Sequence, residues 1–300
     1  MRYAAYDSVT GQPHVVVDGA PQAGTVLTLS HWPRSATPAA LQRDLSAEIA
    51  FAYLDRPELH VDAAVVTNNH PDEDGITSVY VLVDPAAASS RRDLVIETAR
   101  AGDFSTTHSR AAARAAFAIS ALVEDADSDP YPTVLERLTA VFDDPERFRD
   151  LWEREDAELQ AGLDAIAGGA VTIEEHPEVD LAVVTVPQAQ RRPHAIAVHN
   201  ATDRFRVLYV HGRHYEVVFR YETWVQFVSR PVMPRVDLAP LAQLLADLDG
   251  SAWKFDGAGS IIPSLRRVDG GECSLDPHKF GALLHDALQG APPAWDPFGR

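Results

Sequence analysis

The segment that decides the fold prediction is AVVTNNHPDEDGITS, residues 64–78. Its first residues, from Ala64 to Thr67, are apolar or β-branched and predict a short buried strand. A dense polar loop follows, and Gly75 then opens a mostly apolar segment, expected to be a helix or a second strand. In α/β folds, chemistry is commonly found in loops at the carboxyl ends of strands. We therefore expect a functional loop at this point in the chain.

The polar loop carries one imidazole and two carboxylates at alternate positions, in His70, Asp72 and Asp74. An extended loop can point all three side chains to the same side. Mn²⁺ and Mg²⁺ prefer carboxylate oxygens, and an imidazole shifts the preference toward Mn²⁺, Fe²⁺ or Zn²⁺. Without a cation, the two aspartates would repel each other. The alternative is a solvated turn in which the aspartates cap the following helix.

Residues 68–78 resemble the first motif of the DHH phosphoesterase superfamily, which reads roughly His-x-Asn-Pro-Asp-x-Asp-Gly/Ala-Ile-x-Ser. Asp72 and Asp74 fall on the two metal-binding aspartates of that motif. The resemblance implies a metal-dependent phosphoesterase, with His70 as a further ligand or as a general acid or base. Asn68 departs from the motif, because many members have a histidine ligand there, and the sequence contains no Asp-His-His signature. The same run also resembles an uncharacterised bacterial family to which no activity is attached.

Further ligands would have to come from other loops. His31 follows a predicted strand at 25–30 and is expected to face the same crevice as a ligand, although a partly buried histidine is the alternative. Asp103 lies where a second-motif aspartate could fall, and we expect it to be a catalytic partner. The alternative for Asp103 is a cap for the helix after it. Asp18 also ends a strand, but the glycine after it favours a turn.

The alternation of strands and helices predicts an α/β protein with a mostly parallel sheet in its N-terminal lobe. We expect this lobe over 1–125, a helical connector over 126–169, a second, smaller α/β lobe over 170–290 and a tail over 291–300. Strands are expected at 14–18, 25–30, 64–67, 170–174, 181–186, 205–210 and 215–227, and helices at 37–55, 89–100, 107–123, 132–142, 145–167, 193–201, 238–248 and 277–289.

Positive charge is concentrated between Arg204 and Arg235. This region contains six arginines and two glutamates, a net charge of 6 − 2 = +4 in a chain of net charge −18. Guanidinium groups match phosphate oxygens. We expect Arg220, Arg230 and Arg235 to bind the substrate's anionic group. The alternative is a sheet face on which Arg220 pairs with Glu222. Two histidine pairs, His194 with His199 and His211 with His214, lack the spacing of a strong metal motif.

The composition limits the function classes. The strong negative charge argues against broad binding to nucleic acid or to an anionic membrane. A single cysteine and the lack of a signal-peptide pattern predict a soluble, cytoplasmic protein. No nucleotide-binding glycine loop and no nucleophile elbow is present. We expect a phosphohydrolase that uses Mn²⁺ or Mg²⁺ on a small phosphorylated substrate or short nucleotide. Alternatives are a non-catalytic nucleotide- or protein-binding protein on such a scaffold, and a metal-dependent hydrolase of another substrate.

Overall fold

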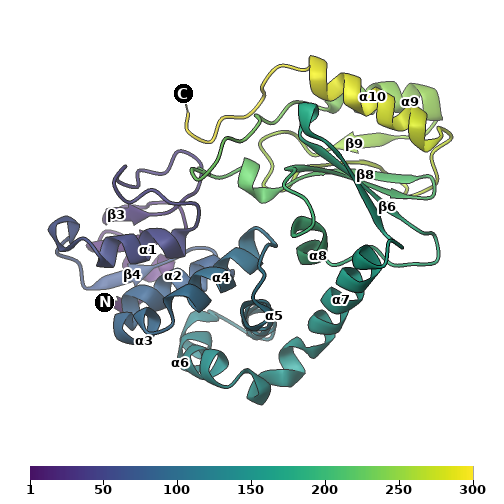
Figure 1. Cartoon of the computed structure of the whole chain (residues 1–300). Coiled ribbons are helices and arrows are strands. Elements are labelled where there is room, and N and C mark those ends of the chain that lie inside the picture. Colours follow the sequence, from purple (N-terminus) through teal and green to yellow (C-terminus); the bar gives the residue numbers. More distant parts are fainter. Residues whose placement is uncertain (300) are drawn as a thin grey trace. The chain divides into compact units, whose positions relative to one another are not determined.

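The computed structural model describes residues 1–299 and shows an α/β protein with two separate sheets (Figure 1). The chain divides into two compact units. The first comprises residues 1–158 and 225–230, and the second comprises residues 159–224 and 231–300. The short segment 225–230 therefore belongs with the N-terminal part of the chain, although it lies far away in sequence. This assignment matters for the site described below.

The first unit contains a four-stranded, fully parallel sheet in the order β1-β4-β2-β3. Because β2, β3 and β4 run in parallel, their carboxyl ends meet at one edge, where Asp18, His31 and Asn68 follow them. The elements of this unit are β1 (Arg2–Tyr3), β2 (His14–Val17), β3 (Thr25–Leu29), α1 (Ser46–Leu54), β4 (Val65–Thr67), α2 (Glu73–Val83), α3 (Pro85–Ser89), α4 (Arg92–Asp103), α5 (Arg110–Glu124) and α6 (Tyr131–Asp143).

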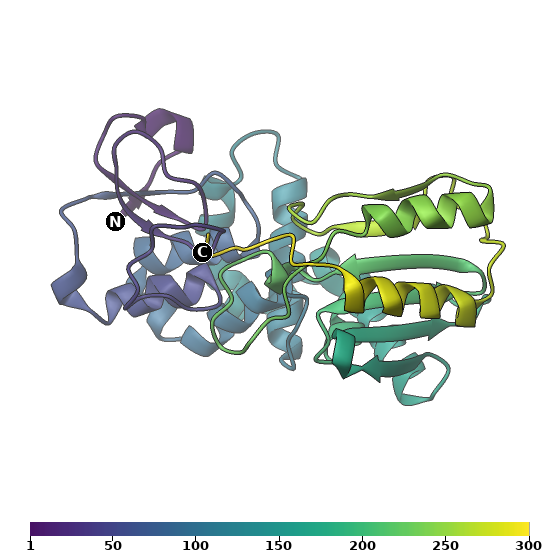
Figure 2. The ribbon, with the colours of Figure 1, turned by 90° about the horizontal axis from the view of Figure 1, so that it is seen from above.

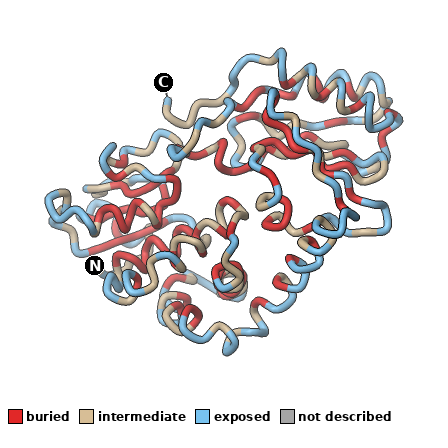
Figure 3. The backbone as a smooth tube through the Cα atoms, in the orientation of Figure 1, coloured by how far each residue is buried: buried red, intermediate tan, exposed pale blue. Residues whose placement is uncertain are grey.

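Helices α1 and α2 pack on each other and on the sheet, and α4 packs on both of them. Helix α2 is buried over most of its length (Figure 3). It follows the polar loop after β4, so of the two alternatives expected there, a helix or a second strand, the structure shows the helix. Helix α6 packs on α2 and α5 in the first unit, and the long helix α7 (Arg149–Ala167) crosses from the first unit to the second.

Two predicted elements differ most from their expected bounds. The helix predicted from residue 37 begins only at Ser46, because the Thr37 hydroxyl instead bonds to the backbone of Ser30 at the end of β3. The strand predicted over 215–227 ends at Phe219, where the buried Arg220 begins a turn into a 3-10 helix, η5 (Tyr221–Thr223). Strands β1, β9 and β10 were not predicted.

The second unit is built on a mixed six-stranded sheet in the order β5-β6-β7-β8-β10-β9. Helices α9 and α10 cover one face of this sheet (Figures 1 and 2), and a core of aliphatic and aromatic side chains fills the space between them. Its elements are β5 (Thr172–His176), β6 (Leu181–Val186), α8 (Ala195–His199), β7 (Arg206–His211), β8 (His214–Phe219), α9 (Ala239–Asp249), β9 (Trp253–Phe255), β10 (Ser264–Arg267) and α10 (Pro277–Gly290). Among the described helices, none is long and apolar enough to cross a membrane.

Candidate metal centre

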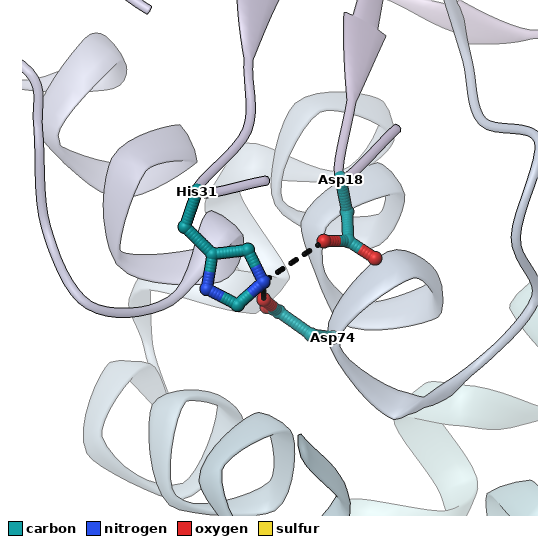
Figure 4. A group of neighbouring side chains, drawn as sticks. All are labelled: Asp18, His31 and Asp74. Atoms are coloured by element: carbon teal, nitrogen blue, oxygen red, sulfur yellow. Dashed lines mark ion pairs between the residues drawn. The ribbon is translucent and has the colours of Figure 1, made fainter. Parts of the chain in front are cut away.

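Four side chains from different elements of the first unit meet at the carboxyl edge of the parallel sheet. Asp18 follows β2, His31 follows β3, Asp74 lies in the first turn of α2, and Asp103 is the last residue of α4. All four side chains are buried, with exposed fractions between 0% and 3%. Figure 4 shows the side chains of Asp18, His31 and Asp74 pointing toward one another. The fold therefore concentrates three carboxylates and one imidazole in a small buried volume.

The imidazole of His31 lies at the middle of this group. Its Nε2 atom is 3.4 Å from Oδ1 of Asp18, 3.7 Å from Oδ2 of Asp74 and 3.3 Å from Oδ2 of Asp103. One ligand atom each from Asp18, His31 and Asp74 lie within 4.8 Å of one another. These three residues could hold a metal ion, and they offer the oxygen and nitrogen donors that hard or borderline divalent cations accept.

The other ring nitrogen of His31 fixes the orientation of the imidazole. Its Nδ1 atom lies 2.5 Å from the backbone carbonyl oxygen of Asp44. Because a carbonyl oxygen can only accept, Nδ1 carries the proton, and Nε2 is the nitrogen that faces the carboxylates. Carboxylates also only accept, so a bare Nε2 lone pair would repel them. A positive charge is required there, either a proton on Nε2 or a cation between the ring and the acids.

Two carboxylates of the group also receive hydrogen bonds from the first turn of α1. Asp74 accepts from the backbone N–H groups of Ser46 and Ala47, each at 2.7 Å, and the Ser46 hydroxyl donates to Oδ1 of Asp18 at 2.8 Å. The positive end of the α1 dipole therefore offsets part of the negative charge. Within residues 1–299, Oδ2 of Asp18 and Oδ2 of Asp103 are buried and accept no hydrogen bond. These oxygens have the chemistry of metal ligands, and a cation fits the donor set.

The pKa shifts follow from this crowding of charge. Burial and the charge of Asp72 raise the pKa of Asp103 well above its ordinary value. Burial raises the pKa of Asp74 to about 6, and the charge of His31 partly offsets this shift. Burial by itself lowers the pKa of His31, but the bonds to Asp103 and Asp18 outweigh it and the net shift is strongly upward. Asp74 and Asp103 thus favour protonation, and the imidazole favours its charged form.

The predicted loop contributes to the surroundings of this group in an unexpected way. Oδ1 of Asp72 accepts from the N–H of Gly75 at 2.8 Å, so Asp72 is the N-cap of α2, which agrees with the capping alternative. Its Oδ2 lies 3.0 Å from Nε2 of His70, and this bond raises the pKa of the half-exposed imidazole to about 9. Gly75 is required here, since a Cβ would overlap the carbonyl oxygen of His70. Of the predicted metal ligands, the structure brings His31 and Asp74 together, with Asp103 beside them.

Asn68 occupies the position of a histidine ligand in the resembling motif, and here it supports Asp18. Its side-chain amide donates to the carbonyl oxygens of Val17 and Asp18, at 2.9 and 2.8 Å. Asp18 has a φ of +41°, a conformation that aspartate tolerates better than most residues. The amide of Asn68 therefore fixes the end of β2 in the bend that turns the Asp18 carboxylate toward His31. Sequence reasoning assigned Asp18 to a turn, and a carboxylate at the end of a parallel strand was the available signal.

The segment 225–230 packs over the histidine of this group. The N–H of Gln226 donates to the carbonyl oxygen of His31 at 2.7 Å. Oδ1 of Asp44 accepts from the N–H groups of Val228 and Ser229, at 2.8 and 2.9 Å. Asp44 thus holds this segment with its side chain and His31 with its carbonyl group. No local sequence pattern could predict this contact, because the partners are nearly two hundred residues apart.

Residues 1–297 match DUF6687, described as a family of unknown function. The chain belongs to this family. No curated protein matches it. The chemistry of the four-residue group in this DUF6687 chain therefore has to be inferred from the geometry of the group itself.

The three arginines predicted to bind substrate in this DUF6687 chain lie in two different units. Arg220 is buried and its guanidinium forms an ion pair with Glu222, the partner weighed from the sequence. Arg235 is also buried and donates to the carbonyl oxygens of Ala258 and Ile261, at 2.9 and 2.8 Å. Arg230 ends the 225–230 segment of the first unit and is partly exposed. The contacts of Arg220 and Arg235 are those of structural side chains, and a role in substrate binding remains a prediction.

The remaining histidine pairs belong to the second unit. His194 is the N-cap of α8, where Nδ1 accepts from the N–H of Ile196 at 3.1 Å, and His199 ends the same helix. His211 and His214 flank the turn between β7 and β8. The DUF6687 metal group is drawn from the first unit, and none of these histidines is among its four members.

Proposed function

We propose that this protein is a divalent-metal-dependent hydrolase of a small phosphoester or phosphoanhydride, with Mn²⁺ or Mg²⁺ as its metal. The observation that carries the proposal is the orientation of His31, whose Nε2 faces three buried carboxylates while Nδ1 donates to the Asp44 carbonyl. Metal-ligating histidines almost always donate their second ring nitrogen in this way. The place of these side chains at the carboxyl edge of a parallel sheet also supports the proposal, because α/β folds bind ligands there.

The oxygen-rich donor set favours Mn²⁺ or Mg²⁺ over a softer metal, and the single imidazole favours Mn²⁺ of the two. Asp18, His31 and Asp74 would hold the ion. Asp103 lies close enough to His31 to share in binding the ion. When bound, a divalent cation activates water and neutralises phosphoryl oxygens. The choice of a phosphoester substrate rests on the resemblance of residues 68–78 to the phosphoesterase motif.

His70 is suited to donate a proton to the leaving group. Asp72 raises the pKa of this imidazole to about 9, so it is charged at neutral pH, and about half of its side chain is exposed. A hollow of about 350 Å³ lies beside the same loop and is lined by Asn68, Asn69 and Tyr131. A general acid typically contributes 10²–10⁴-fold, which sets the effect expected for its removal.

The test is an assay of chelator-treated protein against pyrophosphate, p-nitrophenyl phosphate and bis-p-nitrophenyl phosphate, with and without added Mn²⁺. We expect Mn²⁺-dependent turnover of one of them, lost in His31→Ala and Asp74→Asn and reduced at least about hundredfold in His70→Ala. Asp127→Asn, which removes a charge from an exposed position of the same unit, serves as the matched control. Turnover that is equal in wild type and Asp74→Asn, or absent for all three compounds, would refute the hydrolase.

A further inference from the structure

The second unit contains a hollow of about 270 Å³ on the face of its sheet opposite α9 and α10. In a protein of net charge −18, this hollow is lined by three arginines and two histidines against a single glutamate. They are Arg192, Arg266, Arg267, His211, His214 and Glu216. Its size is near the lower end of small-molecule sites, which start at roughly 300 Å³.

Strand register brings these groups into one row. Tyr209 of β7 pairs with Glu216 of β8, and Glu216 pairs with Arg266 of β10. Side chains directly opposite each other on neighbouring strands share a face of the sheet. Part of this face is covered by the buried Val198 of α8, whereas Glu216 and Arg266 remain partly exposed. The row therefore runs from an apolar end at Tyr209 to a charged end at Arg266.

Arg192 lies over the apolar end of this row. Its guanidinium carbon is 3.4 Å from the centre of the Tyr209 ring, and Nη1 is 2.5 Å from Oε2 of Glu216. The stacking and the ion pair together hold the guanidinium plane in place. With 47% of its side chain exposed, Arg192 keeps an outer face that a planar group can stack on.

Arg266 is fixed at the other end. Its Nη1 lies 2.7 Å from Oδ2 of Asp256 and also donates to the Ser264 hydroxyl, while 43% of the side chain is exposed. Arg267 is more fully engaged, because both Asp249 and Asp269 bind its guanidinium. Arg192 and Arg266 are thus the cations that still have exposed surface toward the hollow.

We propose that this hollow binds a small organic anion, a phosphate or carboxylate group joined to a planar ring. Arg192 and Arg266 bind the oxyanion through charge-assisted hydrogen bonds, and the ring stacks on the outer face of Arg192. Glu216 acts as an internal competitor, since its carboxylate already occupies one nitrogen of Arg192. The site is independent of the metal centre, because all of its residues belong to the second unit.

The test is a calorimetric titration of the whole protein in EDTA with AMP, benzoate, adenosine and inorganic phosphate. EDTA removes any contribution from a bound metal. We expect AMP or benzoate to bind at least about tenfold more tightly than adenosine, because adenosine lacks the anion. Binding of AMP alone assigns the oxyanion as a phosphate, and binding of benzoate alone assigns it as a carboxylate. Ring stacking predicts that inorganic phosphate binds more weakly than AMP.

The variants are Arg192→Gln and Arg266→Gln, each expected to weaken binding about tenfold. Glu216→Gln should strengthen it, which a purely structural pocket would not do. Arg154→Gln, at a side chain that is 83% exposed in the first unit, removes the same charge and should leave the affinity unchanged. Circular dichroism confirms that each variant is folded. If neither AMP nor benzoate binds at millimolar concentration, or if affinity is the same in Arg192→Gln, Arg266→Gln and wild type, the anion site does not exist.

Discussion

The Nε2 atom of His31 lies 3.4 Å from Oδ1 of Asp18, and both side chains are buried to 1% exposure or less. The two residues follow β3 and β2, which are neighbours in the parallel sheet, so their proximity is a direct consequence of topology. An imidazole nitrogen and a carboxylate oxygen at this distance need a positive charge between them or on the ring. Substitutions at and around these two residues test which charge is present and what holds the two groups in place.

Asp103→Asn should increase the stability of the metal-free protein. Burial and the charge of Asp72 hold the pKa of the Asp103 carboxyl well above its ordinary value, so its ionised form is disfavoured in the folded state. A neutral amide removes that cost, and we expect a gain of at least about 1 kcal/mol at neutral pH. Denaturant unfolding in EDTA measures it.

The same substitution should reduce the stabilisation that Mn²⁺ gives, since ligand binding to the native state raises its stability and Asp103 contributes to the site. The control is Asp127→Asn, with no expected effect in either condition. If Asp103→Asn destabilises the metal-free protein, the carboxylates of the group are not in electrostatic conflict.

Asp44→Ala should loosen the packing of residues 225–230 over His31. Its carboxylate is the acceptor for the N–H groups of Val228 and Ser229, and its loss leaves two partly buried donors unpaired, at a cost of about 1–3 kcal/mol. Because the carbonyl of the same residue orients His31, Mn²⁺ affinity should fall as well. Asp55→Ala is the matched control, since this exposed carboxylate pairs with the partly exposed Arg92 and should cost under about 1 kcal/mol.

Part of the candidate site could be predicted from residues 64–78, because a buried strand followed by closely spaced acids is a local sequence pattern. Asp74 lies in the group as predicted, and Asp103 and His31 lie beside it. Asp72 instead caps α2, because it stands just before the helix and the N–H of Gly75, in the first turn, has no acceptor within the helix. Spacing alone does not distinguish a cap from a ligand.

The other half depends on contacts that no local pattern encodes. Asp18 looked like a turn residue, and only the parallel pairing of β2 with β3 and β4 brings it to His31. The cover by residues 225–230 joins segments that are distant in the chain. In the arginine-rich region, Arg220 and Arg235 are buried among protein acceptors, which composition alone does not indicate. The arginines that line the hollow of the second unit, Arg192, Arg266 and Arg267, lie outside that region of sequence.

Arg220→Met should destabilise the protein strongly. The side chains of Arg220 and Glu222 are 2% and 4% exposed, and removing one partner leaves a buried charge without compensation, at a cost of about 3–5 kcal/mol. The double variant Arg220→Met/Glu222→Leu should recover much of the loss. Unfolding free energies of the two variants measure this. Were Arg220 a substrate ligand instead, Arg220→Met would lower activity with little change in stability.

Asp256 predicts a pH dependence in the second unit. Burial alone would raise the pKa of this carboxyl, but Arg266, Lys254 and Ser264 bind it and hold its pKa far below the ordinary value. A depressed folded-state pKa means that the stabilisation is present above the unfolded value, near 3.9, and is lost as the pH falls through the folded value. Asp256→Asn should therefore cost about 1 kcal/mol at pH 7 and progressively less as the pH falls below 4. A constant difference between pH 7 and pH 2 would contradict this.

The most direct test of the central claim is calorimetric titration of chelator-treated protein with Mn²⁺, compared with His31→Ala and Asp74→Asn. The account predicts saturable binding to the wild type and to the Asp127→Asn control. It predicts at least about tenfold weaker binding to His31→Ala and Asp74→Asn, because each loses a ligand atom. Absence of Mn²⁺ and Mg²⁺ binding to the wild type at millimolar concentration, or equal binding to all four proteins, would show that His31 carries a proton rather than facing a metal.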